Sequence, residues 1–189
     1  MSDILDELGP LAALVGSWQG EQGDDKAPDD DRVSVEHNLY RETMTFTPTG
    51  EVNNHEQSLF GLRYATMVWR LDADSAFHEE VGYWLWDAEN RQIMKAFSVP
   101  RGYTALAGGT ADADATSFEL AASVDSESYG INSNLFLTEE FKTVRYELRV
   151  DLLDEDTFSY ESNTLIQIKG QDELFNHLDT NTLRRIEDD

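Results

Sequence analysis

The chain contains no cysteine, few lysines and no long apolar run, and each absence excludes a class of protein. Without cysteine it can form no disulfide, thiolate zinc site, iron–sulfur cluster or thiol nucleophile. Nowhere do about 18 consecutive apolar residues occur, so no membrane-spanning helix is predicted. The first residues carry acids where a secretory signal would carry bases. We therefore expect a soluble, cytoplasmic protein.

Positive charge is scarce, since 14 Lys and Arg oppose 38 Asp and Glu for a net charge of −24. Such a surface repels phosphate groups, so neither nucleic acid nor an anionic membrane is an expected partner. The acids are spread along the chain, which favours a solvated coat over a cation-binding surface. The one dense run, DDKAPDDD over residues 24–31, is expected to be a mobile loop. The length indicates one domain over residues 1–189.

Residues 3–15 hold the one convincing helical pattern, with spaced leucines interrupted at Gly9-Pro10, and predict a short helical lead-in. After Gly16, alternating apolar and polar residues dominate, most clearly over 143–152. Similar patterns cover 54–71, 77–86, 92–99, 103–108, 117–124 and 157–169. About ten antiparallel strands of this kind predict an all-β up-and-down barrel, with a two-sheet sandwich as the alternative.

The stretch FHEEVGYWLWD, residues 77–87, places a histidine and two glutamates among large apolar side chains. A period of two puts His78 on one face with Glu80 and two tryptophans, and this face is expected to line a pocket. The opposite face would then meet the N-terminal helix or a second copy in a homodimer. Glu80 is expected to raise the pKa of His78. The pair is either a proton donor to a bound anion or oxygen species, or a satisfied buried hydrogen bond.

The motif Gly16-Ser17-Trp18 opens the first predicted strand. Its glycine allows a sharp turn out of the helix, and its tryptophan can close one end of a barrel beneath a cation. Arg184 or Arg185 near the C-terminus would supply that cation. A GxW motif with a late arginine resembles the calycin type of barrel, which includes lipocalins and fatty-acid-binding proteins.

Several spaced motifs together carry a more specific resemblance. The segments SLFGLRYATMVWRLDADSAFHEEVGYWLWD, SVPRG and ELFNHLDTNTLRRI, preceded by GSWQGEQG, are similar to the nitrobindin-like haem-binding β-barrel family. The resemblance implies a ten-stranded barrel around haem b, nitric oxide binding and isomerisation of peroxynitrite to nitrate. It also implies that His177 is the axial ligand of the iron and that His78 lies near the haem. Imidazole is a common ligand of haem iron. The expected pocket residues are Glu80, Tyr64, Trp69, Tyr83 and Arg101.

Strand register decides whether His177 can reach the lumen. If Leu183 faces inward, a period of two also turns Asp179, Asn181 and Arg185 inward, which would make the lumen polar, with His177 on the same face. If Leu178 and Ile186 face inward instead, His177 lies outside.

Three functions stay open on the residues alone. The first is a haem barrel for a nitrogen-oxide species. The second is a non-haem carrier of a small apolar ligand, with Arg63, Arg70 or Arg101 as an anion partner. The third is a tightly packed barrel that acts through an exposed aromatic face. No serine-hydrolase, zinc-protease or nucleotide-binding motif occurs.

Overall fold

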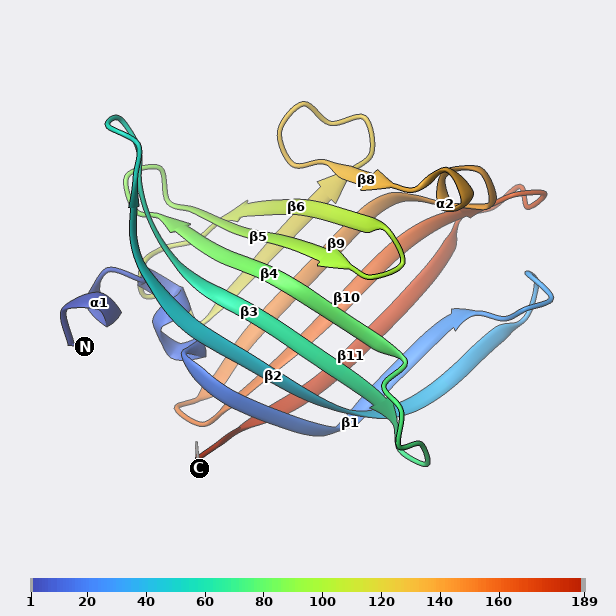
Figure 1. The fold of residues 1–189 in the computed structure, drawn as a ribbon, viewed down its shortest axis with the longest axis horizontal. Coiled ribbons are helices and arrows are strands. Elements are labelled where there is room, and N and C mark those ends of the chain that lie inside the picture. The colour runs from blue at the N-terminus through green and yellow to red at the C-terminus, as the bar shows by residue number, and fades with distance from the viewer. Residues whose placement is uncertain (1, 188–189) are drawn as a thin grey trace.

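The computed structural model describes residues 2–187 and forms a closed antiparallel barrel (Figure 1). The ring runs β1-β2-β3-β4-β5-β6-β7-β9-β10-β11 and returns to β1, while the short β8 pairs with the start of β6. The strands are β1 (Gly16–Pro28), β2 (Val35–Asn53), β3 (Ser58–Arg70), β4 (His78–Asp87), β5 (Gln92–Val99), β6 (Tyr103–Thr110), β7 (Ser117–Ser123), β8 (Ile131–Ser133), β9 (Phe141–Asp154), β10 (Thr157–Ile168) and β11 (Phe175–Ile186). The predicted all-β barrel is confirmed, and the sandwich alternative is wrong.

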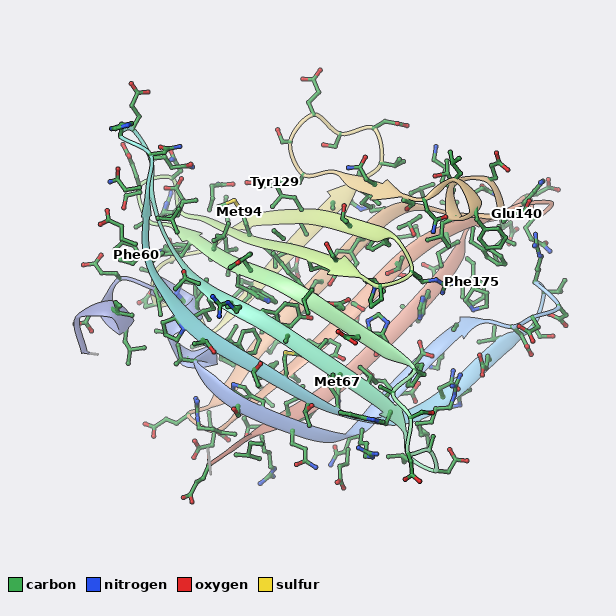
Figure 2. The ribbon with its side chains drawn as sticks, in the orientation of Figure 1. Phe60, Met67, Met94, Tyr129, Glu140 and Phe175 are labelled. Carbon is green, nitrogen blue, oxygen red and sulfur yellow. The ribbon has the colours of Figure 1, made fainter. Side chains whose placement is uncertain are left out.

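Alternation explains why these segments form strands. Along β9, Tyr146, Leu148 and Val150 are buried inside the barrel. Arg145 and Arg149, at the alternate positions, point outward and pair with surface carboxylates. Figure 2 shows side chains on both faces of the wall, with Met67 on the outside of β3, where it is 41% exposed. Closing the ring pairs the strand edges, which removes sites for aggregation.

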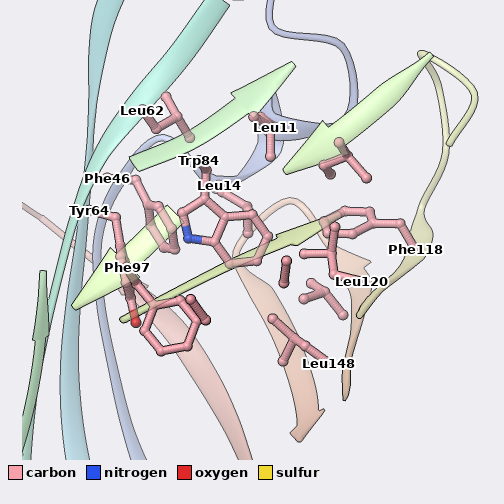
Figure 3. Close-up of a cluster of buried hydrophobic side chains, with 14 of the residues drawn as sticks. Leu11, Leu14, Phe46, Leu62, Tyr64, Trp84, Phe97, Phe118, Leu120 and Leu148 are labelled. Carbon is pink, nitrogen blue, oxygen red and sulfur yellow. The ribbon is translucent and has the colours of Figure 1, made fainter. Parts of the chain in front are cut away.

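A short N-terminal segment plugs one end of the barrel. The predicted lead-in forms two pieces, α1 (Ser2–Asp6) and the 3-10 helix η1 (Gly9–Leu14), separated near Gly9 at φ 52°. Leu11 and Leu14 are fully buried against the aromatic core around Trp84 and Phe118 (Figure 3). None of the helices in residues 2–187 has the length and apolar character needed to cross a membrane.

Trp18 closes the plugged end in the predicted way. Its Nε1 donates a hydrogen bond to the Leu14 carbonyl at 2.8 Å. Arg185 is the cation over the ring, with its guanidinium carbon 4.2 Å from the ring centroid. The same guanidinium donates to the carbonyl oxygens of Ala13 and Val15. The segment before β1 and the last strand thus both contact the Trp18 indole.

The acidic run at 24–31 differs from the expected mobile loop. Residues 24–28 belong to β1, and the turn to β2 is confined to 29–34. That turn is anchored by Arg32, whose Nη1 lies 2.7 Å from Glu140 and whose guanidinium lies over Phe141. The helix α2 (Leu135–Glu140) therefore fixes the turn. Its Glu140 carboxylate and the adjacent Phe141 ring both bind the arginine that follows the acidic run.

Candidate functional site in the barrel lumen

The lumen contains a cavity of about 110 Å³ that extends from the plug to the opposite end of the barrel. Leu14 lines it at the plugged end, and His78 and His177 line it at the other. Phe46, Phe158 and Trp84 form its apolar walls near the plug. The charged lining residues are Glu42, Glu80, Lys95 and Asp179. The cavity is therefore apolar towards the plug and charged further along.

Strand β4 supplies the predicted histidine and glutamate. His78 and Glu80 face the lumen, whereas Val81 and Tyr83 face outward and are 49% and 47% exposed. The His78 Nε2 lies 3.4 Å from Glu80 Oε1. Burial by itself lowers the pKa of His78, but the Glu80 carboxylate outweighs it and raises that pKa above 6.5. The Glu80 carboxylate thus favours the protonated form of the His78 imidazole.

Lys95 on β5 completes a buried ionic cluster that the sequence reasoning missed. Its Nζ lies 2.9 Å from Glu80 Oε2 and 3.2 Å from the Tyr146 hydroxyl. The Tyr64 hydroxyl donates to the same Glu80 oxygen. Burial alone raises the pKa of Glu80, but Lys95 and His78 bring it well below 4.5. The alternation of β5 could have indicated it, because Lys95 occupies an inward position between Ile93 and Phe97.

A second buried network surrounds Glu42 on β2. Its carboxylate accepts hydrogen bonds from Thr66 at 2.7 Å, Tyr160 at 2.9 Å and Asn181 at 3.0 Å. Tyr160 in turn contacts the Tyr40 hydroxyl at 2.8 Å, and Tyr40 donates to Asp179. Burial raises the pKa of Glu42, because three neutral donors stabilise its charge less than water would. The pKa of Asp179 rises to about 7, chiefly through burial.

The register of β11 turns His177 into the lumen. Leu183 is fully buried and Asn181 is 3% exposed, so the inward set includes Asp179 and His177. The alternative with Leu178 and Ile186 inward is wrong, since Ile186 is 41% exposed. The His177 Nε2 lies 2.6 Å from Asp25 Oδ1, and its side chain is 33% exposed.

A β-bulge brings Asp25 to that position. Trp18 and Gly20 face inward along the first half of β1, and the pairing with β2 then shifts between Gly20 and Gly23. After the shift the inward residues are Gly23 and Asp25. A Cβ on Gly23 would lie 2.2 Å from the Tyr40 ring, so only glycine fits there. A strand of unbroken period two does not predict this arrangement, and the sequence reasoning missed Asp25.

Three expected pocket residues lie outside the lumen. Trp69 is half-buried on the outer face of β3 beneath Arg41, 4.6 Å away. Tyr83 lines an outer groove with Val81. Arg101 is exposed in the β5–β6 turn, where its carbonyl accepts a hydrogen bond from Asn134. The lumen therefore unites His177, His78, Glu80 and Tyr64 of the predicted set.

Comparison with known proteins agrees with this architecture. The barrel is similar to the crystal structure of Rv2717c from M. tuberculosis, with a TM-score of 0.69 and 21% identity over 96% of this chain and 98% of that one. It is also similar to the S-type phycobiliprotein lyase CPES from Guillardia theta, with a TM-score of 0.55 and 12% identity over 99% and 98% of the two chains. At these identities the likeness concerns the fold alone. No curated protein matches the chain.

A family model gives the more specific assignment, and it agrees with the resemblance carried by the sequence motifs. It spans both the GSW motif of β1 and the His177 strand, so the match covers the plug and the lumen. Because the model matches residues 7–185, the chain belongs to the family of the THAP4-like, heme-binding beta-barrel domain.

Proposed function

We propose that this barrel binds haem b through the His177 imidazole and handles a small nitrogen-oxide species there. The observation that carries the proposal is the inward-facing His177 at the end of the lumen away from the plug. One ring nitrogen is bonded to Asp25, and the other has no hydrogen-bond partner among residues 2–187. Imidazole in this arrangement is a suitable iron ligand, because a carboxylate on one nitrogen orients the lone pair of the other.

The side chains present fit haem in their chemistry. They provide an imidazole donor and aromatic walls. The cavity of about 110 Å³ is smaller than the roughly 300–1,000 Å³ of small-molecule pockets, so side chains must move outward on binding. His78 and His177 are 37% and 33% exposed, whereas Glu80 is 12% exposed and Lys95 7%. We therefore expect the Glu80–Lys95 ion pair to stay in place when a ligand enters.

When bound, haem iron supplies the site for nitric oxide or a related species. We propose that His78 assists peroxynitrite isomerase activity. Conversion of the peroxynitrite anion to nitrate rearranges one anion into another, with no net gain of protons or electrons. The protein must then hold an anion in a fixed place, and the imidazolium of His78, supported by Glu80, is suited to that task.

Hemin titration of the purified protein tests the proposal. The wild type is expected to give a Soret band that His177→Ala loses. His37→Ala is the matched control, because His37 also pairs with a carboxylate, Asp24 at 3.0 Å, but is 53% exposed. His78→Ala should keep the band and slow peroxynitrite decay by about 10²–10³-fold. A wild type without a Soret band would refute the haem proposal.

The second candidate is a non-haem carrier of a small ligand, and the modest cavity volume favours it. Its anion partner would be Lys95, which faces the lumen, whereas Arg63 lines the outer groove and Arg101 is exposed. Arg70 is engaged with Asn38 and Glu36. Saturable binding of a fluorescent fatty-acid analogue, together with failure to take up hemin, would select this candidate.

A further inference from the structure

We propose that the lumen holds an inner binding site for a small uncharged carbonyl compound, whose oxygen accepts a hydrogen bond from the indole N–H of Trp84. Along β4, Trp84 lies between Glu80 of the ionic cluster and Trp86 beside the plug, where a Cβ on Gly9 would lie 2.6 Å from the Trp86 Nε1. The site involves neither lumen histidine and needs no haem, so it goes beyond the proposed function.

The indole nitrogen of Trp84 is a buried donor without an acceptor. The side chain is 3% exposed, and among residues 2–187 its Nε1 has no hydrogen-bond partner. Trp18 shows the usual arrangement for a buried indole, because its Nε1 donates to the Leu14 carbonyl. Leaving a buried N–H without an acceptor destabilises a protein, and an oxygen atom supplied by a ligand removes that cost.

This nitrogen is on the lumen side of the indole ring. Trp84 lines the cavity together with His78 and Glu80, the other inward residues of β4. In Figure 3 the nitrogen lies on the side of the ring towards Tyr64 and away from Phe118. Tyr64 lines the cavity as well, whereas Phe118 packs against the indole with the ring centroids 6.2 Å apart.

The space and its walls fit an apolar body of the size of a small ring. The cavity of about 110 Å³ is close to the roughly 150 Å³ of an apolar cavity that holds benzene. The rings of Phe46 and Tyr64 lie 6.1 and 6.3 Å from that of Trp84, centroid to centroid, and the Tyr64 hydroxyl is committed to Glu80. A buried water needs several polar partners. A ring compound with one acceptor oxygen therefore suits these aromatic walls better than water.

The charges around the site favour an uncharged ligand. Lys95 Nζ lies 5.8 Å from the centroid of the Trp84 ring, and Glu80 matches its charge at 2.9 Å. Glu42 and Asp179 also line the cavity, so an added anion would meet further carboxyl groups. Lys95 would repel a cation, and a cation brings no acceptor to the indole N–H. A small ketone combines the acceptor with an apolar body and no charge.

Binding of cyclopentanone and benzene to the ¹⁵N-labelled full chain without hemin tests the site. The two rings have the same number of non-hydrogen atoms, and only cyclopentanone carries an acceptor. After sequential assignment, the indole N–H resonance of Trp84 should move downfield and saturably with cyclopentanone but not with benzene. The Trp18 indole resonance is the internal reference, because its N–H is already bonded to Leu14 and should not move.

Two variants separate the hydrogen bond from the shape of the cavity. Trp84→Phe keeps an aromatic ring and removes the N–H, so it should bind cyclopentanone about three- to tenfold more weakly. It should bind benzene at least as tightly as the wild type, which also shows that the variant is folded. Trp86→Phe is the matched control, since Trp86 is 2% exposed on the same strand but its Nε1 lies beside Gly9. Its affinity for cyclopentanone should equal that of the wild type.

Several results would overturn this inference. One is a wild type that binds no cyclopentanone saturably. Another is binding without a downfield shift of the Trp84 indole N–H. A third is a Trp84→Phe variant with the same affinity for cyclopentanone as the wild type. None of these measurements involves hemin, so this inference and the haem proposal succeed or fail separately.

Discussion

The Lys95–Glu80 pair allows a quantitative test of how the charged part of the lumen is stabilised. The two charges are 2.9 Å apart, and their side chains are 7% and 12% exposed. Lys95→Met keeps most of the apolar stem but leaves the Glu80 carboxylate with Tyr64 and His78 as its donors. Removing one member of a buried pair costs about 3–5 kcal/mol, because the remaining charge is still desolvated. We expect the free energy of unfolding to fall by that amount at neutral pH.

The pH dependence of this loss follows from the pKa of Glu80. In the wild type that pKa is depressed below 4.5, so the ionised carboxylate stabilises the fold above about pH 4.5 and this contribution is lost as the pH falls. In Lys95→Met, we expect burial to outweigh the remaining contacts with His78 and Tyr64 and to raise the pKa of Glu80 above its unfolded value. The variant then loses stability as the pH rises through the new folded value. The difference in the free energy of unfolding between the wild type and Lys95→Met should be largest near about pH 8 and smallest near about pH 4, each within about one pH unit.

Urea unfolding at pH 4.5 and pH 8, followed by tryptophan fluorescence, measures both effects. The double variant Lys95→Met with Glu80→Gln should recover much of the loss, since no buried charge remains. Lys169→Met is the matched control. Lys169 pairs with Glu140 at 2.6 Å but is 60% exposed, so its removal should leave the free energy of unfolding almost unchanged. A Lys95→Met variant that behaves like Lys169→Met at pH 8 would refute this account of the lumen.

Two further predictions concern the wall and the plug. Gly23→Ala should destabilise the protein by about 1–3 kcal/mol in thermal unfolding, because the new Cβ would lie 2.2 Å from the Tyr40 ring. Gly130→Ala, whose Cβ would have its nearest neighbour at 3.4 Å, is the control, and equal stability of the two would contradict the bulge model. Arg185→Met should cost about 2–3 kcal/mol and red-shift the fluorescence of Trp18, which it covers at 4.2 Å; an unchanged spectrum would count against the plug.

Part of the site was predictable from local alternation, and part was not. His78 and Glu80 face the lumen because β4 keeps an unbroken period of two. The same alternation places Tyr83 on the outer face of β4, because it is an odd number of residues from His78. Trp69 likewise lies on the outer face of β3. Lys95 was overlooked although the alternation of β5 places it inward.

The sequence by itself determined the all-β barrel, the plug and the strand that carries His78, because alternation, turn residues and the Gly16–Trp18 motif act over short distances. The tertiary structure alone decided what each inward charge meets. Asp25 and His177 are 152 positions apart. Their contact depends on a bulge that exchanges the inward-facing and outward-facing positions along β1. Lys95 and Tyr146 are 51 positions apart and meet inside the lumen. Such contacts arise from closure of the sheet, which brings together side chains whose local patterns carry no information about one another.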